Sequence, residues 1–406
     1  MDKCPYVLDR AGRDIHEEAR NLRARGPVTL VELHGGYTAW SVTSYEIAKQ
    51  LLVDPRISKN TKTHWPEFRD GKVPQDWELY TWVAMDNMQT RDGAEHDRLR
   101  SLVAQAFTSR QVAKSRPIIE DIVSRLLDDL TAVPAGEVVD IKGRYFYPLS
   151  TILIGDLLGI SDQDRGAALH GAQVNAKTTN TAEESEANLL QWTSALGHLV
   201  ETKRREPGDD LTTVMIEATN DETAPLTDDE VIGSVHLLIG TGTETTANVL
   251  CHTLIDLLTH PDQLELILSG AVGWEAAWEE VVRKDGAVGS LPFRCAVEDI
   301  EIGGVTIAKG DLVLINYAAA GRDPEKYGDT AADFDITRED KTSLSFGYGR
   351  HRCLGSVLAT LEAMVALPAL FERFPNLALA VPAAGLKPQG TFIFNGYAEV
   401  PVLLKG

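Results

Sequence analysis

Hydrophobic and polar residues alternate along this chain with two periods, and the helical period dominates. Apolar residues recur at three- and four-residue steps in residues 96–107, 116–130 and 150–160, which predicts amphipathic helices there. Residues 28–42, VTLVELHGGYTAWSV, predict two strands joined at a Gly-Gly turn. Weaker strand patterns return in residues 297–317 and 392–406. The expected fold is therefore mainly α with a minor β region.

The longest predicted helix, residues 227–260, has a centre that forms a helix poorly. It begins with a capping box at Thr227 and Glu230 and ends where Pro261 follows. Its middle, LLIGTGTETTANVL, contains two glycines and several threonines, which lower helix propensity. Gly240 and Gly242 indicate either close packing against another helix or a flat ligand lying against the backbone.

Bulk properties narrow the class of protein. No repeat, low-complexity tract or linker divides the chain, so residues 1–406 are expected to form one domain. The net charge of −21 argues against nucleic-acid binding, and no window approaches a membrane span or a signal peptide. Cysteine usage is sparse, which predicts a cytoplasmic location and neither a zinc knuckle nor a disulfide scaffold. The cysteines are Cys4, Cys251, Cys295 and Cys353.

The segment FGYGRHRCLG, residues 346–355, sets one thiol apart from the others. Cys353 follows a loop containing Gly347 and Gly349 and precedes the apolar helical run 354–374, whose N-terminal dipole favours a thiolate. A free cysteine is more often an inert buried residue. A lone thiolate with open space opposite it nevertheless suits haem iron, because the porphyrin supplies the other four ligands.

This segment and the rest of the chain resemble the cytochrome P-450 superfamily of haem-thiolate monooxygenases, in its soluble actinobacterial form. FGYGRHRCLG matches the F-G-x-G-x-H-x-C-L-G haem loop of that family at every fixed position. The resemblance implies a single-domain cytochrome P-450 fold, with the long central helix crossing haem b and Cys353 as the axial iron ligand. The residues that it implies as partners of the haem propionates are His96, Arg100, Arg294 and His351.

Two further motifs carry the resemblance. Glu280 and Arg283 match its E-x-x-R; alone, such a pair indicates a surface ion pair, whereas the family implies a buried network with Arg338. Residues 241–246, TGTETT, resemble the oxygen-binding groove, which makes Glu244 and Thr245 the catalytic acid–alcohol pair. Thr241 stands there in place of the usual alanine or glycine.

The resemblance also implies partners and a substrate class. Electrons would come from NAD(P)H through a ferredoxin reductase and a ferredoxin that docks near the Cys353 face. Similar actinobacterial members oxidise macrocycles and steroids, so we expect a monomer that hydroxylates a macrolide, steroid or cyclic peptide in secondary metabolism. The candidate substrate contacts are Trp82, Val83, Leu238, Thr241, Val288, Leu291 and Phe394.

Two other functions stay open from the sequence. The same haem could couple two aromatic or cyclodipeptide units through C–C or C–N bonds without inserting oxygen. The protein could also be a non-catalytic haem sensor. Glu244 and Thr245 argue against a sensor, because a sensor needs no proton relay. Product mass separates hydroxylation, a gain of one oxygen, from coupling, a loss of two hydrogens.

Overall fold

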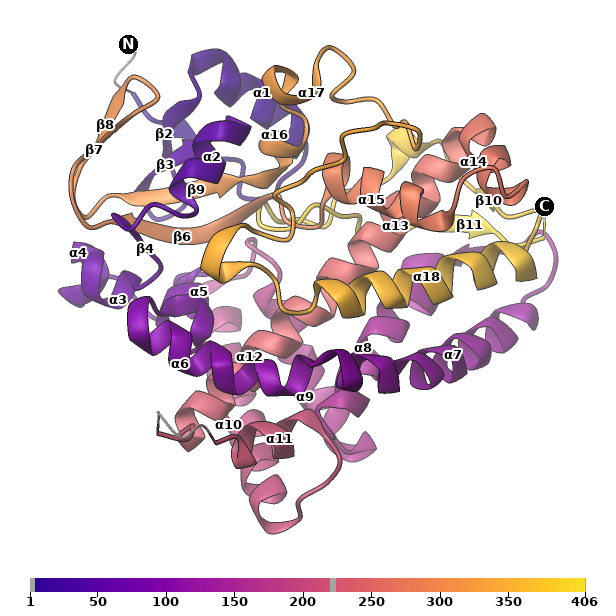
Figure 1. Ribbon diagram of the computed structural model, residues 1–406, viewed down its shortest axis with the longest axis horizontal. Coiled ribbons are helices and arrows are strands. Elements are labelled where there is room, and N and C mark those ends of the chain that lie inside the picture. The colour runs from indigo at the N-terminus through magenta and orange to yellow at the C-terminus, as the bar shows by residue number, and fades with distance from the viewer. Residues whose placement is uncertain (1–3, 220–223, 406) are drawn as a thin grey trace.

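A computed structural model describes residues 4–219 and 224–405, and it sets a small β region beside a larger helical one (Figure 1). The expectation of a mainly α fold with a minor β region is confirmed. The α-helices are α1 (Ile15–Arg25), α2 (Tyr45–Leu51), α3 (Thr61–His64), α4 (Pro66–Arg69), α5 (Tyr80–Ala84), α6 (Gly93–Val103), α7 (Ser109–Thr131), α8 (Tyr147–Leu157), α9 (Asp162–Asn175), α10 (Ala182–Arg205), α11 (Leu211–Glu217), α12 (Asp228–Gly242), α13 (Glu244–Thr259), α14 (Pro261–Leu268), α15 (Trp274–Asp285), α16 (Tyr317–Gly321), α17 (Pro324–Tyr327) and α18 (Ser356–Arg373). None of the helices described is both long and apolar enough to cross a membrane.

The strands form a main sheet with the order β1-β2-β3-β9-β6-β4 and two smaller sheets. The predicted hairpin is confirmed, because β2 and β3 pair antiparallel with Leu30 opposite Trp40. The pattern in residues 392–406 gives only one short strand, and Phe394 forms an isolated bridge with Val288. The strands are β1 (Tyr6–Val7), β2 (Val28–Glu32), β3 (Thr38–Val42), β4 (Ile57–Ser58), β5 (Val138–Asp140), β6 (Ser290–Ala296), β7 (Ile300–Ile302), β8 (Val305–Ile307), β9 (Leu312–Asn316), β10 (Ala378–Leu379) and β11 (Pro401–Leu403).

The helix predicted over residues 227–260 is two helices, α12 and α13, so the prediction of one continuous helix was wrong at its centre. The chain bends at Thr243, between them. Hydroxyl groups of Thr241, Thr243 and Thr245 each donate to the carbonyl oxygen four residues earlier, a contact that bends helices. Close packing also accounts for a glycine here, because a Cβ on Gly242 would lie 2.6 Å from Ile154 Cδ1 of α8.

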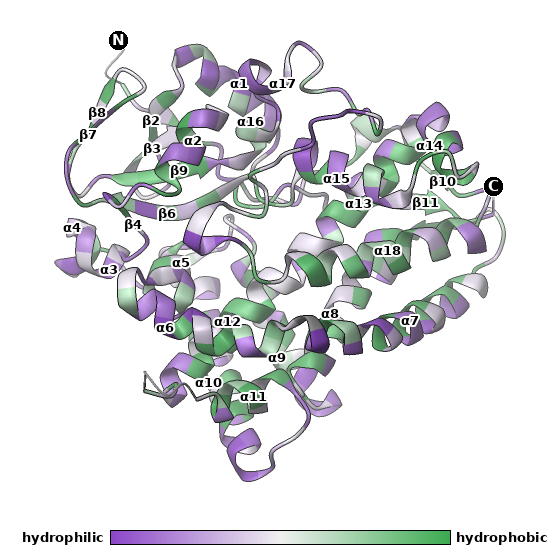
Figure 2. Ribbon diagram, viewed as in Figure 1, coloured by the Kyte–Doolittle hydropathy of each residue, from purple (hydrophilic) through white to green (hydrophobic). Residues whose placement is uncertain are grey.

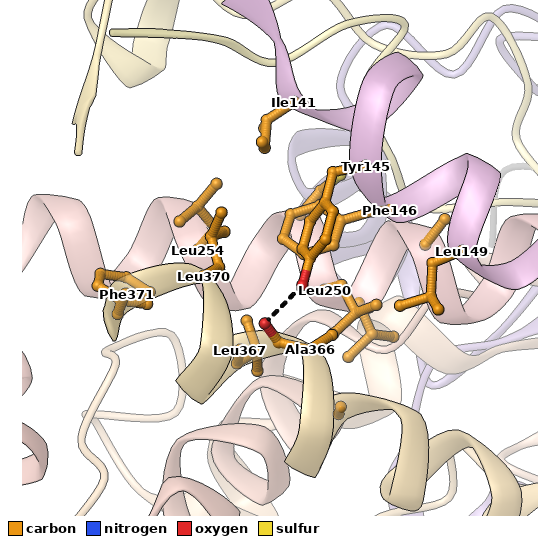
Figure 3. Packing of buried hydrophobic residues seen from close by; sticks show 14 of the residues in the cluster. Ile141, Tyr145, Phe146, Leu149, Leu250, Leu254, Ala366, Leu367, Leu370 and Phe371 are labelled. Carbon is orange, nitrogen blue, oxygen red and sulfur yellow. Dashed lines mark hydrogen bonds between the residues drawn. The ribbon is translucent and has the colours of Figure 1, made fainter. Parts of the chain in front are cut away.

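The hydrophobic core packs α13 against α18 and against the π-helical turn η3 (Lys142–Phe146) that leads into α8, and it packs α18 against α7. Figure 3 shows Leu250 and Leu254 of α13 facing Leu367 and Leu370 of α18. The buried Tyr145 hydroxyl donates to the Ala366 carbonyl oxygen at 2.9 Å. Figure 2 shows hydrophobic and hydrophilic residues interleaved along α7, whose buried residues belong to this core. The core therefore fixes α13 and α18 relative to each other.

The pair Glu280 and Arg283 on α15 is buried rather than exposed, with both residues at 0% exposure. Arg283 Nε and Nη2 donate to the two Glu280 carboxylate oxygens at 2.8 and 2.7 Å. Arg283 Nη1 donates to the carbonyl oxygen of Gly321 at 2.8 Å, and Arg338 Nε donates to Glu280 Oε1 at 3.1 Å. The buried network with Arg338 is confirmed, and it ties α15 to the loop after α17.

We predict that Glu280→Ala or Arg283→Ala lowers the free energy of unfolding by about 3–5 kcal/mol, because each leaves one buried charge without its partner. Urea unfolding of the purified variants measures this. Arg116→Ala is the matched control: its ion pair with Glu120 is 54% exposed on both sides, so its loss should cost less than about 1 kcal/mol. Glu280→Ala protein as stable as the wild type would contradict the prediction.

Candidate active site

A cavity between the main sheet and the helices gathers most of the residues predicted to be functional. Its walls come from α5, α6, α12, α13, β6, α18 and the loop that precedes α18. It therefore unites segments that lie up to about three quarters of the chain apart. The predicted residues that line it are Trp82, His96, Arg100, Leu238, Thr241, Thr245, Val288, Leu291, Arg294, His351, Cys353 and Phe394.

The loop before α18 presents Cys353 to this cavity. Gly347 and Gly349 have φ values of +73° and +74°, a left-handed conformation that favours glycine. The Cys353 N–H donates to the Phe346 carbonyl oxygen at 2.8 Å, which closes the loop on itself. Cys353 lines the cavity, so its accessible surface faces this internal space although protein atoms surround the residue.

Opposing effects act on the Cys353 thiol. Burial among protein atoms raises its pKa, and this is the largest effect. Hydrogen bonds from the backbone N–H groups of Gly355 and Ser356, and the positive charge of Arg100, lower the same pKa. The α18 N-terminus thus favours a thiolate as predicted, although burial outweighs it in the protein alone.

Two of the predicted basic residues tie α6 to the Cys353 loop. His96 and Arg100 are four residues apart on this helix, so they share a face. Arg100 Nη2 donates to the Arg352 carbonyl oxygen at 2.6 Å, and His96 Nε2 lies 3.2 Å from the Arg350 carbonyl oxygen. Both side chains also line the cavity, so α6 supplies basic groups next to the thiol.

The other two predicted basic residues reach the cavity from β6 and from the loop. Pairing of β6 with β9 is irregular between Leu291 and Arg294, and such bulges re-aim side chains next to functional sites. Arg294 is 4% exposed, and its Nη1 has no hydrogen-bond partner within the described chain. Burial lowers the pKa of His351 to about 4, while the nearby Asp92 carboxylate, 3.5 Å from Nε2, acts in the opposite direction.

Glu244 and Thr245 face different surroundings despite being neighbours. Thr245 lines the cavity, and its hydroxyl donates to the Thr241 carbonyl oxygen at 2.5 Å. The Glu244 carboxylate is buried behind the cavity wall, where Gln389 Nε2 donates to it at 2.7 Å and Lys142 Nζ lies at 3.4 Å. The structure therefore does not bring the carboxylate to the cavity with the hydroxyl.

The proposed substrate contacts divide in the same way. The Trp82 ring on α5 lies 5.9 Å from the Phe394 ring, and both line the cavity. Val83 instead packs fully buried into a hydrophobic cluster with Trp65 and Phe293. Because successive helical residues point in different directions, only Trp82 of this pair reaches the cavity wall.

Lys59 and Glu362 are among the cavity residues that the sequence analysis missed. Lys59 lines the cavity and is 4% exposed, yet no motif surrounds it. Glu362 on α18 also lines the cavity; burial raises its pKa to about 8, and a hydrogen bond from the Ser150 hydroxyl opposes that shift. A lone carboxylate in the apolar run 357–370 was a signal for Glu362. Lys59 offered no comparable signal.

Comparison with known proteins agrees with the fold and the cavity. A model of the cytochrome P-450 family matches residues 198–267 and 274–379. The chain is 49% identical to 2-hydroxy-5-methyl-1-naphthoate 7-hydroxylase of Streptomyces carzinostaticus, covering 99% of this chain and 98% of that protein. It is 37% identical to 6-deoxyerythronolide B hydroxylase of Saccharopolyspora erythraea, covering 97% and 96%.

Solved structures give the same result. CYP154A1 from Streptomyces coelicolor is 43% identical and superimposes with a TM-score of 0.91, covering 98% of this chain and 100% of that one. CYP154C4 from a Streptomyces species is 39% identical with a TM-score of 0.95, covering 99% and 98%. Over nearly its whole length, this chain therefore belongs to the cytochrome P-450 family of monooxygenases.

Proposed function

We propose that this P-450 monooxygenase holds haem b in the cavity, with the Cys353 thiolate as axial ligand, and hydroxylates a natural product. One observation carries the proposal: the Cys353 thiol and several basic side chains open onto the same cavity as the apolar residues. The names of the relatives, which are hydroxylases, support catalysis rather than a sensor.

The residues around the cavity fit haem b. Arg294 places a buried guanidinium atom there that has no partner within the described chain. Arg100 adds a second guanidinium group on the same cavity, and His96 and His351 add imidazole groups, so two propionates would meet positive charge and hydrogen-bonding groups. When bound, haem with a thiolate ligand supplies the oxygen-activating chemistry of this family.

We propose that Thr245 passes protons into the cavity and that Glu244 supplies them. The Thr245 hydroxyl is at the cavity wall, within one residue of the buried Glu244 carboxylate. Because Gln389 and Lys142 hold that carboxylate behind the wall, each proton crosses to Thr245 through a water molecule or a change of the Glu244 rotamer. Thr241 is a second hydroxyl at the wall, one turn earlier.

The electron route and setting are also proposals. Electrons would pass from NAD(P)H through a ferredoxin reductase to a ferredoxin that docks near the Cys353 loop. Arg350 and Arg352 are exposed on that loop, and positive charge there would steer an anionic partner toward it. We place the enzyme in the cytoplasm as a monomer.

We propose a medium-to-large substrate, such as a macrolide, steroid or cyclic peptide. The apolar residues that would contact this substrate at the cavity wall are Trp82, Leu238, Val288, Leu291 and Phe394. The relatives named for 6-deoxyerythronolide B and for a methylnaphthoate support a macrolide and add fused aromatic acids to the compounds that should be tested.

Optical difference spectra recorded with each of these compounds would identify the ligands that perturb the haem absorption. The mass of the product would then identify the reaction. A gain of one oxygen supports hydroxylation. A loss of two hydrogens would support oxidative coupling instead, and absence of any product with any ligand and redox partner would contradict the proposal.

We predict that Cys353→Ser abolishes the red-shifted Soret band of the reduced carbon-monoxide complex, because a hydroxyl cannot replace the thiolate donor. Optical spectra of haem-loaded protein test this. Cys251→Ser is the matched control, since that thiol is buried in α13 within the hydrophobic core. An unchanged band in Cys353→Ser would remove Cys353 as the ligand.

We predict that Thr245→Ala uncouples the enzyme: NADPH consumption continues, hydrogen peroxide rises, and product per NADPH falls by about tenfold or more. The reason is loss of the hydroxyl that delivers protons at the wall. Thr253→Ala is the control, because its buried hydroxyl makes the same bond to the carbonyl oxygen four residues earlier.

The position of the relay follows from a second variant. Unchanged coupling in Thr245→Ala together with uncoupling in Thr241→Ala would move the proton relay to Thr241. Thr246 also lines the cavity, but it points about 100° further round the helix, so Thr246→Ala should have the smaller effect.

A further inference from the structure

Lys59 is a buried lysine whose side chain has no carboxylate partner in the described part of the chain. The residue is 4% exposed and follows directly after β4. Its ammonium Nζ donates to the Pro292 carbonyl oxygen at 3.3 Å, and none of the ion pairs found within 4.0 Å includes it. A protonated lysine has three N–H donors, and this bond uses one of them. Lys59 therefore has donors left for an anion that enters the cavity.

The sheet places this cation beside Arg294. Ser58 on β4 pairs with Cys295 on β6, so the residues that follow and precede them, Lys59 and Arg294, lie next to each other. Both line the cavity, and Arg294 Nη1 is itself buried without a partner in the described chain. Burial, and then the positive charge of Arg294, hold the pKa of Lys59 well below its usual range. Two basic side chains thus converge on one wall of the cavity, and an anion bound there would favour the charged form of Lys59.

The carboxylate of Asp92, which contacts the Lys59 backbone, is already engaged by other groups. Its Oδ2 accepts hydrogen bonds from the Lys59 backbone N–H at 2.8 Å, from the Asn60 N–H at 3.1 Å and from the Ser58 hydroxyl. Its Oδ1 faces His351 at 3.5 Å. Asp92 positions the Lys59 backbone without pairing with its ammonium. Burial disfavours the charged form of Lys59, and an anion in the cavity would stabilise that form.

We propose that Lys59 binds a propionate of haem b, as a partner beyond His96, Arg100, Arg294 and His351. The inference rests on the proposed function, because it requires haem in this cavity. A carboxylate on the substrate has the same chemistry, and the experiment below separates the two sources. A cation beside a propionate favours the ferrous state, because reduction adds an electron to the site.

The experiment compares substrate-free, haem-loaded wild type with Lys59→Met. Removing the cation should shift the ferric–ferrous equilibrium about tenfold toward ferric, which is about 59 mV for a one-electron couple. Spectroelectrochemistry measures this potential, and transfer of haem to apomyoglobin, expected to be faster, is the second readout. Lys59→Arg should restore both values.

Lys62→Met is the matched control, because it removes the same charge three residues further on. Lys62 Nζ pairs with Asp86 at 2.9 Å and its side chain is 31% exposed, outside the residues that line the cavity. Its potential and haem transfer should equal those of the wild type. A shift as large as that of Lys59→Met would attribute the effect to net charge and overturn the proposal.

Each of the remaining outcomes either supports the proposal or overturns it. A Lys59→Met protein that keeps full haem, the red-shifted carbon-monoxide band and the wild-type potential would overturn the assignment. If that variant loses affinity only for carboxylated ligands, the substrate is the source and the haem assignment is overturned. If Lys59→Met retains no haem, recovery of haem in Lys59→Arg supports the proposal and its failure overturns it. Absence of the carbon-monoxide band in the wild type would instead refute the proposed function.

Discussion

Positive charge buried around one cavity is set against a chain whose net charge is −21, and the active site depends on this contrast. Arg294 and Lys59 are each 4% exposed, and both line the cavity. Burying such groups is unfavourable unless an anion joins them. The two propionates of the proposed haem would supply that anion, so the proposal links the chemistry of the site to its stability.

Elsewhere the fold neutralises its buried charges with its own residues. Arg283 meets Glu280 through two hydrogen bonds and adds a backbone carbonyl group, so that network is complete without a ligand. It fixes α15, which packs against α13 and α18. Helix α13 carries Thr245, and α18 begins just after the loop that contains Cys353. A charge network that is complete within the protein thus supports a cavity in which Lys59 and Arg294 Nη1 have no carboxylate partner in the described chain.

Sequence patterns predicted those parts of the site whose chemistry is written in neighbouring residues. The loop 346–355 combines glycines, basic residues and a thiol within ten positions, so its place at the cavity could be predicted. The low helix propensity of residues 237–250 marked the region of the break, but its position at Thr243 depends on threonine hydroxyl–carbonyl bonds that only the folded chain shows. Lys59 and Gln389 gave no signal, since their partners lie more than a hundred residues away along the chain. Such contacts exist only in the folded chain.

The most direct test of this account is the affinity of the apoprotein for haem b compared with its dimethyl ester, which has the same porphyrin and iron but no carboxylates. Each buried charge pair lost costs about 2–5 kcal/mol, and about 1.4 kcal/mol is a factor of ten in affinity. The account predicts that the ester binds at least about a hundredfold more weakly. Equal affinity for the two would contradict the claim that paired carboxylates complete the cavity.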